Sequence, residues 1–490
     1  MMGTDALAEK VTIKDARLFI DGEYVDSISG QTFETMNPAT NEKLAEVAKG
    51  DAADVQRAIE VAQRTFESGV WSGMPVEERS AILCKMSDLI MEKVDELAYI
   101  EALDVGKPIK ESRSFDIPRA ASNFRFFAEM AKYVVHEHYD KHNIMSYAKY
   151  APAGVTSLII PWNLPFMQLT WKASAALAAG NTVVVKPASY TPLSAVMLGE
   201  IANEAGLPPG VLNIITGPGS TAGTAMTTHP NVRRISFVGE SKTGKTIMKN
   251  AAENLIPVSL ELGGKSANIV FDDADLDEAV KGSIDAIYRN QGEICLAGSR
   301  LLIQESIYDR FLEKFVEAVR KINVGDPTDE ATDMGALVSE SHLETVHQYV
   351  EIGLGEGAKL ACGGKKVAGL EKGNFYEPTV LYDVDNKMRV AQEEIFGPVL
   401  VAIPFKTEED AIRIANDSIY GLAGVVWTND IRRAHRVTAA VNSGLLWINC
   451  WYIRDLRTPF GGSKASGIGR EGGRHSFEFY TEAKTVTMKL

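Results

Sequence analysis

The hydrophobic residues of this chain follow two different spacings along its length. Between about residues 50 and 135 they recur every three or four positions, as in residues 53–68 and 79–103, which is the spacing of amphipathic helices. Beyond Gly154, short apolar and β-branched runs alternate with helical patterns. Because strands that alternate with helices form parallel, doubly wound sheets, this pattern predicts an α/β fold. The strand-like runs lie at residues 155–160, 182–186, 211–216 and 233–238.

A second α/β block begins near Leu262. Its strand-like runs and helical patterns alternate in the same way, and its C-terminal end has a different pattern of apolar and polar residues. The tail, residues 477–490, alternates apolar and polar positions and is predicted to be a strand. With residues 146–152 it could form a small separate sheet or an exchanged edge. The strand-like runs of the block are 266–272 and 299–304, and the helical patterns are 277–291, 311–322 and 409–417.

Composition narrows the class of protein. With 490 residues, 45% of them hydrophobic and 24% charged, the chain has the composition of an ordinary globular protein with about three structural units. No apolar run approaches about 18 residues and the N-terminal residues lack an apolar core, so neither a membrane span nor a secretory signal is expected. The formal net charge of −14 argues against nucleic acid or an anionic membrane as the main partner.

The chain has four cysteines, Cys84, Cys295, Cys362 and Cys450, and none stands in CxxC spacing. A disulfide framework and a zinc site are therefore not expected, and a reduced, cytoplasmic location is. At least one of the four is a candidate reactive thiol.

Two glycine-rich segments are candidate phosphate-binding loops. Residues 217–223, GPGSTAG, follow an apolar run but are one residue too long for GxGxxG, so a plain glycine-rich turn is an equal alternative. Residues 239–246, GESKTGKT, fit GxxxxGK[ST] in full, which makes a P-loop nucleotide hydrolase a second hypothesis. Hydrolysis would leave the motifs farther along the chain unexplained. In either case, a strand that turns into a helix N-terminus is suited to bind phosphate.

Three other residues suggest nucleophilic catalysis. Cys295 follows a glycine turn after a long helical pattern, although a free thiol is more often a buried structural residue. Glu261 ends an apolar strand, where burial raises the pKa of a carboxyl and suits a general base; the alternative is an ordinary salt-bridged glutamate. Asn163, held between two prolines, could donate to an oxyanion or, as a turn residue, bond its own backbone. All three together are far less expected by chance than any one.

The chain resembles the aldehyde dehydrogenase superfamily from end to end. The motifs that carry the resemblance are PWNLP, VVVKPAS, LELGGKS, QGEIC, EEIFGPV and PFGGSKASGIGRE. The resemblance implies that Cys295 is the nucleophile, that Glu261 is the general base, and that Asn163 forms the oxyanion hole with the backbone N–H of Cys295. Glu261 argues against a CoA-acylating variant, and the presence of all three residues argues against a non-enzymatic relative.

The resemblance also implies a nicotinamide cofactor, NAD and/or NADP. Lys186 is expected at the adenosine ribose, Gly219 and Gly239 near the pyrophosphate, and Glu394 at the nicotinamide ribose with Phe396 packed close by. Glu240 departs from the serine of many relatives, and we expect it to turn away or to cap the following helix, with Lys245 and Thr246 inside that helix. Further cofactor contacts are expected from Ile160, Pro161, Trp162, Ser189, Ser241 and Leu262.

The residue three positions after Lys186 bears on the choice of cofactor. Many NAD-preferring relatives carry a glutamate there, whose carboxylate repels a 2′-phosphate. This chain has Ser189, so we predict that NADP is accepted alongside NAD. The alternative is that Ser189 is a plain helix N-cap.

The implied reaction needs no metal. The thiolate of Cys295 attacks the aldehyde carbon, a hydride passes to the nicotinamide, and the thioester that remains is hydrolysed by water that Glu261 activates. The product is a carboxylic acid.

The substrate is suggested by residues 449–460, NCWYIRDLRTPF, and 116–119, DIPR, which are similar to 2-hydroxymuconic and 2-aminomuconic semialdehyde dehydrogenases. That resemblance implies that Arg119 and Arg457 clasp a substrate carboxylate, as bidentate guanidinium groups do, with Trp171 beside them. We therefore expect an aldehyde with a distal carboxylate, such as 2-hydroxymuconate semialdehyde. The alternatives are internal salt bridges of either arginine and, because CLAGSR is typical of broad-specificity relatives, a general aldehyde dehydrogenase.

The family architecture implies three units. A Rossmann-like cofactor domain is expected over residues 1–130 and 151–261, and an α/β catalytic domain over 262–462. A small β oligomerisation segment is expected over 131–150 and 463–490. A homodimer or homotetramer that acts on a small-molecule aldehyde follows from this architecture.

Overall fold

The computed structural model describes residue 7 and residues 9–490. Its first unit is built on an eight-stranded sheet in the order β2-β1-β9-β8-β7-β10-β11-β21. The central strands β9, β8, β7, β10 and β11 are parallel, which confirms the predicted α/β fold with a doubly wound sheet. In the order of the sheet, the strands are Glu23–Val25, Leu18–Ile20, Leu212–Ile214, Thr182–Lys186, Val155–Ile159, Val232–Val238, Val258–Glu261 and Gly467–Ile468.

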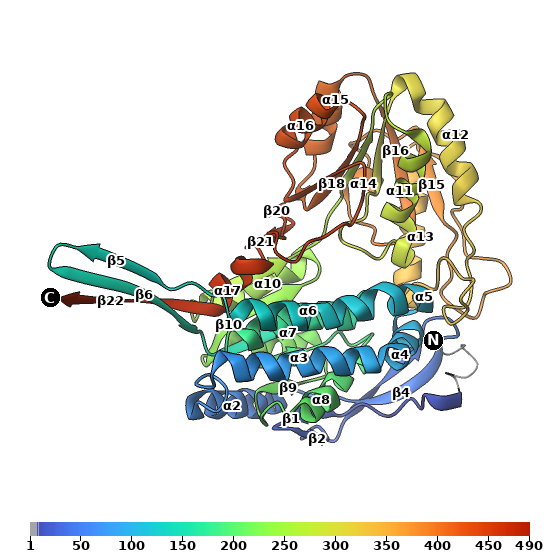
Figure 1. The fold of residues 1–490 in the computed structure, drawn as a ribbon. Helices are drawn as coiled ribbons and strands as arrows, with labels where there is room; N and C mark the ends of the chain where they lie inside the picture. The colour runs from blue at the N-terminus through green and yellow to red at the C-terminus, as the bar shows by residue number, and fades with distance from the viewer. Residues whose placement is uncertain (1–6, 8) are drawn as a thin grey trace.

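Helices cover both faces of this sheet, and a hairpin of β3 (Thr32–Asn37) and β4 (Glu42–Ala48) lies beside it (Figure 1). The apolar spacing of residues 79–103 does not form a single helix, because the chain breaks at Lys93. The helices are α2 (Ala52–Ser68), α3 (Val76–Glu92), α4 (Val94–Val105), α5 (Ile109–Glu111), α6 (Ile117–Ala131), α7 (Pro165–Ala178), α8 (Leu193–Ala205), α9 (Thr224–Thr228) and α10 (Ser241–Ala252), with π-helical turns at Ser112–Asp116 and Gly219–Gly223.

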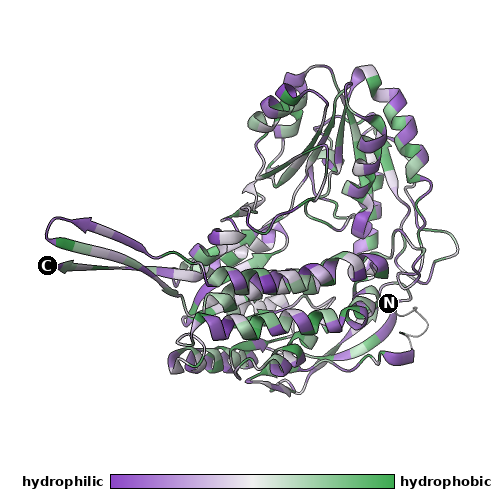
Figure 2. Cartoon of the chain, viewed as in Figure 1, coloured by the Kyte–Doolittle hydropathy of each residue, from purple (hydrophilic) through white to green (hydrophobic). Residues whose placement is uncertain are grey.

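The second unit contains a seven-stranded sheet in the order β14-β15-β16-β13-β12-β18-β19, parallel except for β14. Its outer helices carry hydrophilic and hydrophobic residues together, as Figure 2 shows for α12. The strands are β12 (Ala267–Val270), β13 (Arg300–Gln304), β14 (Lys359–Cys362), β15 (Thr379–Tyr382), β16 (Val399–Phe405), β18 (Ala423–Trp427) and β19 (Leu445–Ile448), with β17 (Tyr420–Gly421) and β20 (Ser463–Lys464) paired separately. The helices are α11 (Leu276–Tyr288), α12 (Tyr308–Val319), α13 (Glu340–Gly355), α14 (Arg389–Gln392), α15 (Glu408–Asn416) and α16 (Ile431–Ala440).

A three-stranded antiparallel sheet projects from the body as an arm (Figure 1). It consists of β5 (Glu137–Lys141), β6 (Ile144–Pro152) and β22 (Thr481–Lys489). The pairing of β22 with β6 runs from Thr481 opposite Pro152 to Lys489 opposite Ile144, so the separate sheet predicted for these two segments is present.

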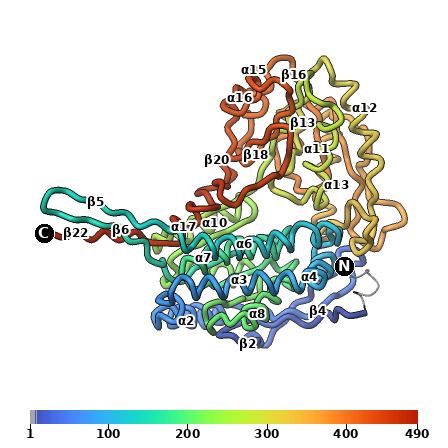
Figure 3. The backbone as a smooth tube through the Cα atoms, in the orientation of Figure 1, coloured from blue at the N-terminus to red at the C-terminus, as the bar shows by residue number. Residues whose placement is uncertain are grey.

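The C-terminal segment differs from its prediction in two respects. Residues 477–480 belong to α17 (Gly473–Tyr480) and not to a strand, because Phe477 and Tyr480 are both buried, with α17 packed on α7. The segment expected at 463–490 is also divided, since β21 joins the first sheet beside β11 and only β22 enters the arm. Figure 3 shows this segment leaving the second unit, crossing to the first and ending in the arm.

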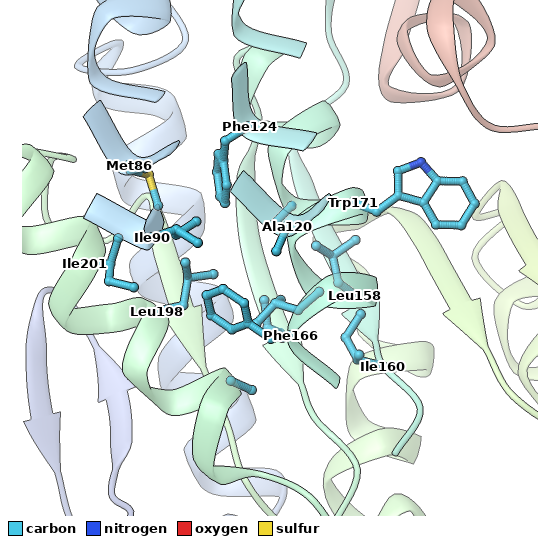
Figure 4. Packing of buried hydrophobic residues seen from close by; sticks show 14 of the residues in the cluster. Met86, Ile90, Ala120, Phe124, Leu158, Ile160, Phe166, Trp171, Leu198 and Ile201 are labelled. Atoms are coloured by element: carbon cyan, nitrogen blue, oxygen red, sulfur yellow. The ribbon is translucent and has the colours of Figure 1, made fainter. Parts of the chain in front are cut away.

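The largest hydrophobic core lies around α7, all of whose residues are buried. It packs between α6 and the sheet, with Phe124, Leu158 and Phe166 fully enclosed. In Figure 4, Trp171 stands at the margin of this cluster with its ring directed away from the other labelled residues. Trp171 also lines a cavity at this margin of the core.

Candidate active site

The loop that carries Cys295 has an unusual backbone. After α11, three consecutive residues take left-handed conformations: Asn290 (φ 49°), Gln291 (φ 56°) and Gly292 (φ 74°). A Cβ atom on Gly292 would lie 2.3 Å from the carbonyl oxygen of Gly397, so only glycine fits there. Non-glycine residues in this region carry strain, which persists where the surrounding structure enforces it and is typical of functional loops. The turn leaves the Cys295 side chain half-buried.

Asn163 is fixed to this loop. Its Nδ2 donates to the carbonyl oxygen of Glu293 at 2.7 Å, two residues before Cys295. In return, Nδ2 of Asn290 donates to the carbonyl oxygens of Asn163 (3.2 Å) and Glu293 (3.1 Å). The buried Asn163 side chain thus bonds the nucleophile loop and not its own backbone, and the second N–H of its amide is left for a ligand.

Glu261 ends β11 as a buried carboxyl, and within the described residues neither of its oxygens has a hydrogen-bond partner or an ion pair. Burial raises its pKa to about 8, against the opposing effect of Lys172. Burial also raises the pKa of the Cys295 thiol to about 12, with smaller contributions from Glu394 and Glu261. The thiol is therefore protonated in the ligand-free enzyme, and Glu261 is a base with a pKa near neutrality within its electrostatic range.

A buried ion pair that we did not predict lies near Glu261. Nζ of Lys172 in α7 lies 2.6 Å from Oε2 of Glu471, and the other oxygen of Glu471 accepts hydrogen bonds from Ser236 (3.1 Å) and Ser259 (2.7 Å). The signal in the sequence is a lysine in an otherwise largely apolar helix, but nothing in it names the partner some 300 residues away.

The expected adenosine end of the cofactor site is formed after β8. Nζ of Lys186 donates to the carbonyl oxygens of Pro187 (2.7 Å) and Gly217 (3.2 Å), and the Ser189 hydroxyl donates to Gly217 at 3.2 Å. Helix α8 begins at Leu193 with Pro192 at its N-cap, so Ser189 is not the helix cap considered above. Among residue 7 and residues 9–490, no heavy atom beyond the neighbours of Gly219 in the chain lies within 4 Å of a Cβ built on that glycine, so the space beside this turn is open to the described residues.

The second glycine loop leads into α10. A Cβ on Gly239 would lie 2.4 Å from the Phe237 ring, so the glycine allows a tight turn. Glu240 occupies the N-cap position, but its carboxylate accepts a hydrogen bond from the Thr243 hydroxyl (3.0 Å) and caps no backbone N–H. The Ser241 hydroxyl donates to the carbonyl oxygen of Ala465 at 2.8 Å. The first-turn amides of α10 are thereby left without a side-chain cap, as an anion-binding helix end requires.

Lys245 and Thr246 are exposed residues inside α10. The Thr246 hydroxyl donates to the carbonyl oxygen of Lys242 in its own helix. These two residues therefore do not stand at the loop as the lysine and threonine of a P-loop would, which removes the structural basis of the nucleotide hydrolase hypothesis.

The expected nicotinamide end is built around Glu394 and Phe396. Oε1 of Glu394 accepts from the backbone N–H of Gly264 at 3.0 Å, and a Cβ on Gly263 would lie 1.9 Å from its other oxygen. Phe396 takes a left-handed φ of 59°, and its ring meets Trp162 edge to face at 5.2 Å. A strained aromatic residue, a cradled carboxylate and an uncapped helix end fit a dinucleotide. The backbone N–H of Ile160 donates to the carbonyl oxygen of Lys186, and that of Leu262 donates to the carbonyl oxygen of Ser466. Both side chains are buried in hydrophobic clusters, and Pro161 lies between Ile160 and Trp162.

A narrow cavity opens beside Trp171. Arg119 enters it from α6, and Arg454 from the loop after β19. The Arg454 guanidinium lies 4.0 Å from the centre of the Trp171 ring and 4.1 Å from that of Phe460. Within the described residues, Nη2 of Arg119 and both Nε and Nη2 of Arg454 are buried without a hydrogen-bond partner. The cavity is lined by Phe115, Arg119, Asn123, Met167, Gln168, Trp171, Tyr452 and Arg454.

Arg457 is not in this cavity, and its predicted place there is corrected. Its side chain is 78% exposed and forms an ion pair with Asp455, with Nη2 and Oδ2 2.5 Å apart. This is the internal salt bridge that was the alternative at the sequence level. Arg454, three residues earlier, occupies the cavity, because the loop after β19 directs position 454 inward and position 457 outward. Arg119 lines this cavity, and the clasp of a substrate carboxylate expected of it stays a prediction.

Comparisons with known proteins agree with this geometry. The model of the aldehyde dehydrogenase family matches residues 24–486. The chain belongs to the aldehyde dehydrogenase family.

Relatives of this aldehyde dehydrogenase include the 2-hydroxymuconic semialdehyde dehydrogenase of Pseudomonas sp. (strain CF600), 43% identical over 98% of this chain and 100% of the relative. The 5-carboxymethyl-2-hydroxymuconate semialdehyde dehydrogenase of Escherichia coli is 45% identical over 95% of this chain and 99% of the relative. Among solved structures, an indole-3-acetaldehyde dehydrogenase in complex with NAD+ superimposes with a TM-score of 0.98, at 42% identity and 100% coverage of both chains. In residue 7 and residues 9–490 of this aldehyde dehydrogenase, we find no helix with the length and apolar character of a membrane span.

Proposed function

We propose that this aldehyde dehydrogenase oxidises an aldehyde with a distal carboxylate, of the type of 2-hydroxymuconate semialdehyde, to the corresponding dicarboxylic acid. The observation that carries the proposal is the pair of guanidinium groups, Arg119 and Arg454, that share one cavity and have unpaired N–H groups there. Leaving buried donors unpaired is costly, so a ligand with several acceptor oxygens is the natural complement. Two of the relatives described above act, by their names, on semialdehydes of this kind.

The chemistry rests on three residues. Cys295 attacks the aldehyde carbon as a thiolate, after its thiol proton has passed to solvent water. Asn163 and the backbone N–H of Cys295 donate to the oxyanion that develops on the former carbonyl oxygen. A nicotinamide held by Glu394 and its neighbours would supply the hydride acceptor that the conversion of the adduct into a thioester requires. Glu261 then takes a proton from the water that attacks the thioester, and the acid leaves as Cys295 recovers its thiol.

The cofactor is NAD, with NADP also accepted. Lys186, Gly219, Gly239 and Glu394 would hold it along the open side of the first sheet, and Ser189 presents a neutral hydroxyl where a carboxylate would repel a 2′-phosphate. Solved relatives that superimpose on this chain hold NAD+.

The two units built on the large sheets have different proposed roles. The unit with the eight-stranded sheet, proposed over residues 1–130 and 151–261 and joined by β21 from the C-terminal segment, binds the cofactor, and residues 262–462 carry the nucleophile. The arm, formed from 131–150 and the end of the chain, joins copies into a homodimer or homotetramer, because the free edges of β5 and β22 can bind another strand. Four free cysteines agree with a reducing, cytoplasmic location.

The decisive experiment compares an anionic with a neutral substrate. Replacing Arg119 or Arg454 by Gln should lower kcat/KM for 2-hydroxymuconate semialdehyde about 10- to 150-fold, because each removes a charge-assisted hydrogen bond. The kcat/KM for hexanal, which has no carboxylate, should stay within about twofold of the wild-type value, a difference too small for a lost hydrogen bond. Arg457→Gln is the matched control, since its guanidinium pairs with Asp455 outside the cavity, and it should change neither rate. Equal losses with both substrates in the Arg119 and Arg454 variants would favour a general aldehyde dehydrogenase.

A further inference from the structure

Tyr452 stands out in the loop after β19 because of its backbone. Its φ is 59°, in the left-handed region that an aromatic residue rarely adopts. The ring is fixed by its neighbours: its centroid lies 5.5 Å from that of Phe115 and 5.0 Å from that of Trp451, and the Arg289 guanidinium lies 5.7 Å from its centre. Strain of this kind persists only where the surroundings hold it, and here they direct one side chain into the substrate cavity.

The Tyr452 hydroxyl has no hydrogen-bond partner within the described residues, although Tyr452 lines the same cavity as Arg119 and Arg454. Burial raises its pKa to about 12, with Asp116 and Cys295 raising it and Arg454 and Arg289 lowering it. The phenol therefore keeps its proton at neutral pH and is available as a donor. A phenylalanine would fill the same ring position, so the ring packing does not account for the hydroxyl.

The position of the Tyr452 hydroxyl suggests which part of a bound substrate would lie beside it. It lies within electrostatic range of the Cys295 thiol and of both cavity arginines. A substrate with its aldehyde carbon at Cys295 and its carboxylate at Arg119 and Arg454 must extend past Tyr452. Because Tyr452 lines the same cavity as the two arginines, we place its hydroxyl beside the portion of the carbon chain that adjoins the carboxylate.

We propose that the Tyr452 hydroxyl donates a hydrogen bond to an oxygen substituent on the carbon next to the substrate carboxylate. This inference rests on the proposed function and narrows it, from any aldehyde with a distal carboxylate to semialdehydes of 2-hydroxy or 2-oxo acids. Tyr452 is then a specificity-determining residue. A site that is built to bond a polar substituent discriminates against the analogue without it, because the site's own donor is left unpaired.

The test uses Tyr452→Phe in the full-length enzyme and two substrates that differ in one group. The substrates are 2-hydroxymuconate semialdehyde and 6-oxohexa-2,4-dienoate, which has the same six-carbon unsaturated chain and carboxylate without the 2-hydroxyl. The variant should lower kcat/KM about 3- to 12-fold for the hydroxylated substrate, as expected for one hydrogen bond, and less than about twofold for the other. As a second readout, the inhibition constant of 2-hydroxymuconate should rise while that of muconate stays constant.

Tyr308→Phe is the matched control, because its hydroxyl donates to the backbone carbonyl of Ala402 at 3.4 Å, away from the cavity. It should leave the ratio of the two substrates unchanged. If Tyr452→Phe slows both substrates equally, the hydroxyl only supports the fold of the loop and the inference is overturned. The proposed function is judged separately, since Arg119→Gln against hexanal reports on the carboxylate alone.

Discussion

The proposed general base Glu261 can accept a proton only after it has lost its own, and its burial makes this loss difficult near neutral pH. Its pKa of about 8 lies within the range where the enzyme can be assayed. The neighbouring Lys172 and Arg454 hold this pKa below the value that burial alone would give. The functional residues of the site are thus defined as much by their surroundings as by their identities.

The pH dependence of the hydrolytic step follows. The unprotonated carboxylate is the active form, so the steady-state rate should rise as the pH increases through about 8 and level off above it. Glu261→Gln should release one equivalent of reduced cofactor in a rapid burst and then stall at the thioester. Stopped-flow absorbance between pH 6 and 9.5 measures both phases. A wild-type steady-state rate in Glu261→Gln would show that another group is the base.

The assignment of Cys295 makes a complementary prediction. Cys295→Ala should remove both the burst and the steady state, because no adduct can form, yet leave the affinity for NAD within about twofold, since no cofactor-binding hydrogen bond is lost. Cys450→Ala, the matched thiol control, should remain active. Activity in the Cys295 variant would transfer the nucleophile to another residue.

The cofactor preference depends on Ser189. Ser189→Glu places a carboxylate beside Lys186, where it would repel a 2′-phosphate and bond free ribose hydroxyls. The variant should lose kcat/KM for NADP by about 10-fold or more relative to NAD, which corresponds to about 1.4 kcal/mol of discrimination. Steady-state kinetics with both cofactors measure the ratio. Equal losses would mean that residue 189 does not face the 2′ position.

Among the elements of the fold, the alternation of strands and helices was predictable because period-two and period-3.6 patterns are local. The predictions that were wrong concern features that depend on tertiary contacts. The alternating residues 477–480 are helical because Phe477 and Tyr480 are buried with α17 packed on α7. Arg454 enters the cavity in place of Arg457, and this could not be predicted because an irregular loop has no period that gives the direction of a side chain. Short motifs were enough to propose Cys295, Glu261 and Asn163 as catalytic residues. The pair of Lys172 and Glu471 could not be predicted in this way, because it joins distant segments.

The left-handed turn before Cys295 is an element on which activity should depend. Gly292→Ala puts a Cβ atom 2.3 Å from the carbonyl oxygen of Gly397 and adds a residue at positive φ. It should lower the Tm by about 1–3 °C, corresponding to about 1–3 kcal/mol, and reduce the burst. Gly355→Ala, at the end of α13 with open space around it, is the control and should keep both. An active, stable Gly292→Ala enzyme would show that the turn relaxes freely.

At the scale of the whole molecule, the arm pairs two strands that are more than 300 residues apart in the sequence, β6 and the C-terminal β22. Val486 pairs with Tyr147 in the middle of β22 and β6. Val486→Pro removes a backbone donor and should weaken the arm, so that light scattering after gel filtration finds a smaller assembly than for the wild type. Val486→Thr keeps the strand and should assemble normally. If the proline variant assembles like the wild type, subunits associate through another surface.

The route of the C-terminal segment also has a consequence for how the enzyme is made. Glu471, which neutralises Lys172 in the middle of α7, and β21, which closes the first sheet beside Glu261, both lie within the final stretch of the polypeptide. On the ribosome, domains fold from the N-terminal side as they emerge. The nascent first unit therefore stays incomplete until translation has passed through the whole second unit. Until then, Lys172 has no carboxylate partner in Glu471, and the edge of β11 is not covered by β21. Premature termination after residue 462 and before β21 should yield a chain that contains the proposed catalytic residues Asn163, Glu261 and Cys295 and still lacks both β21 and Glu471.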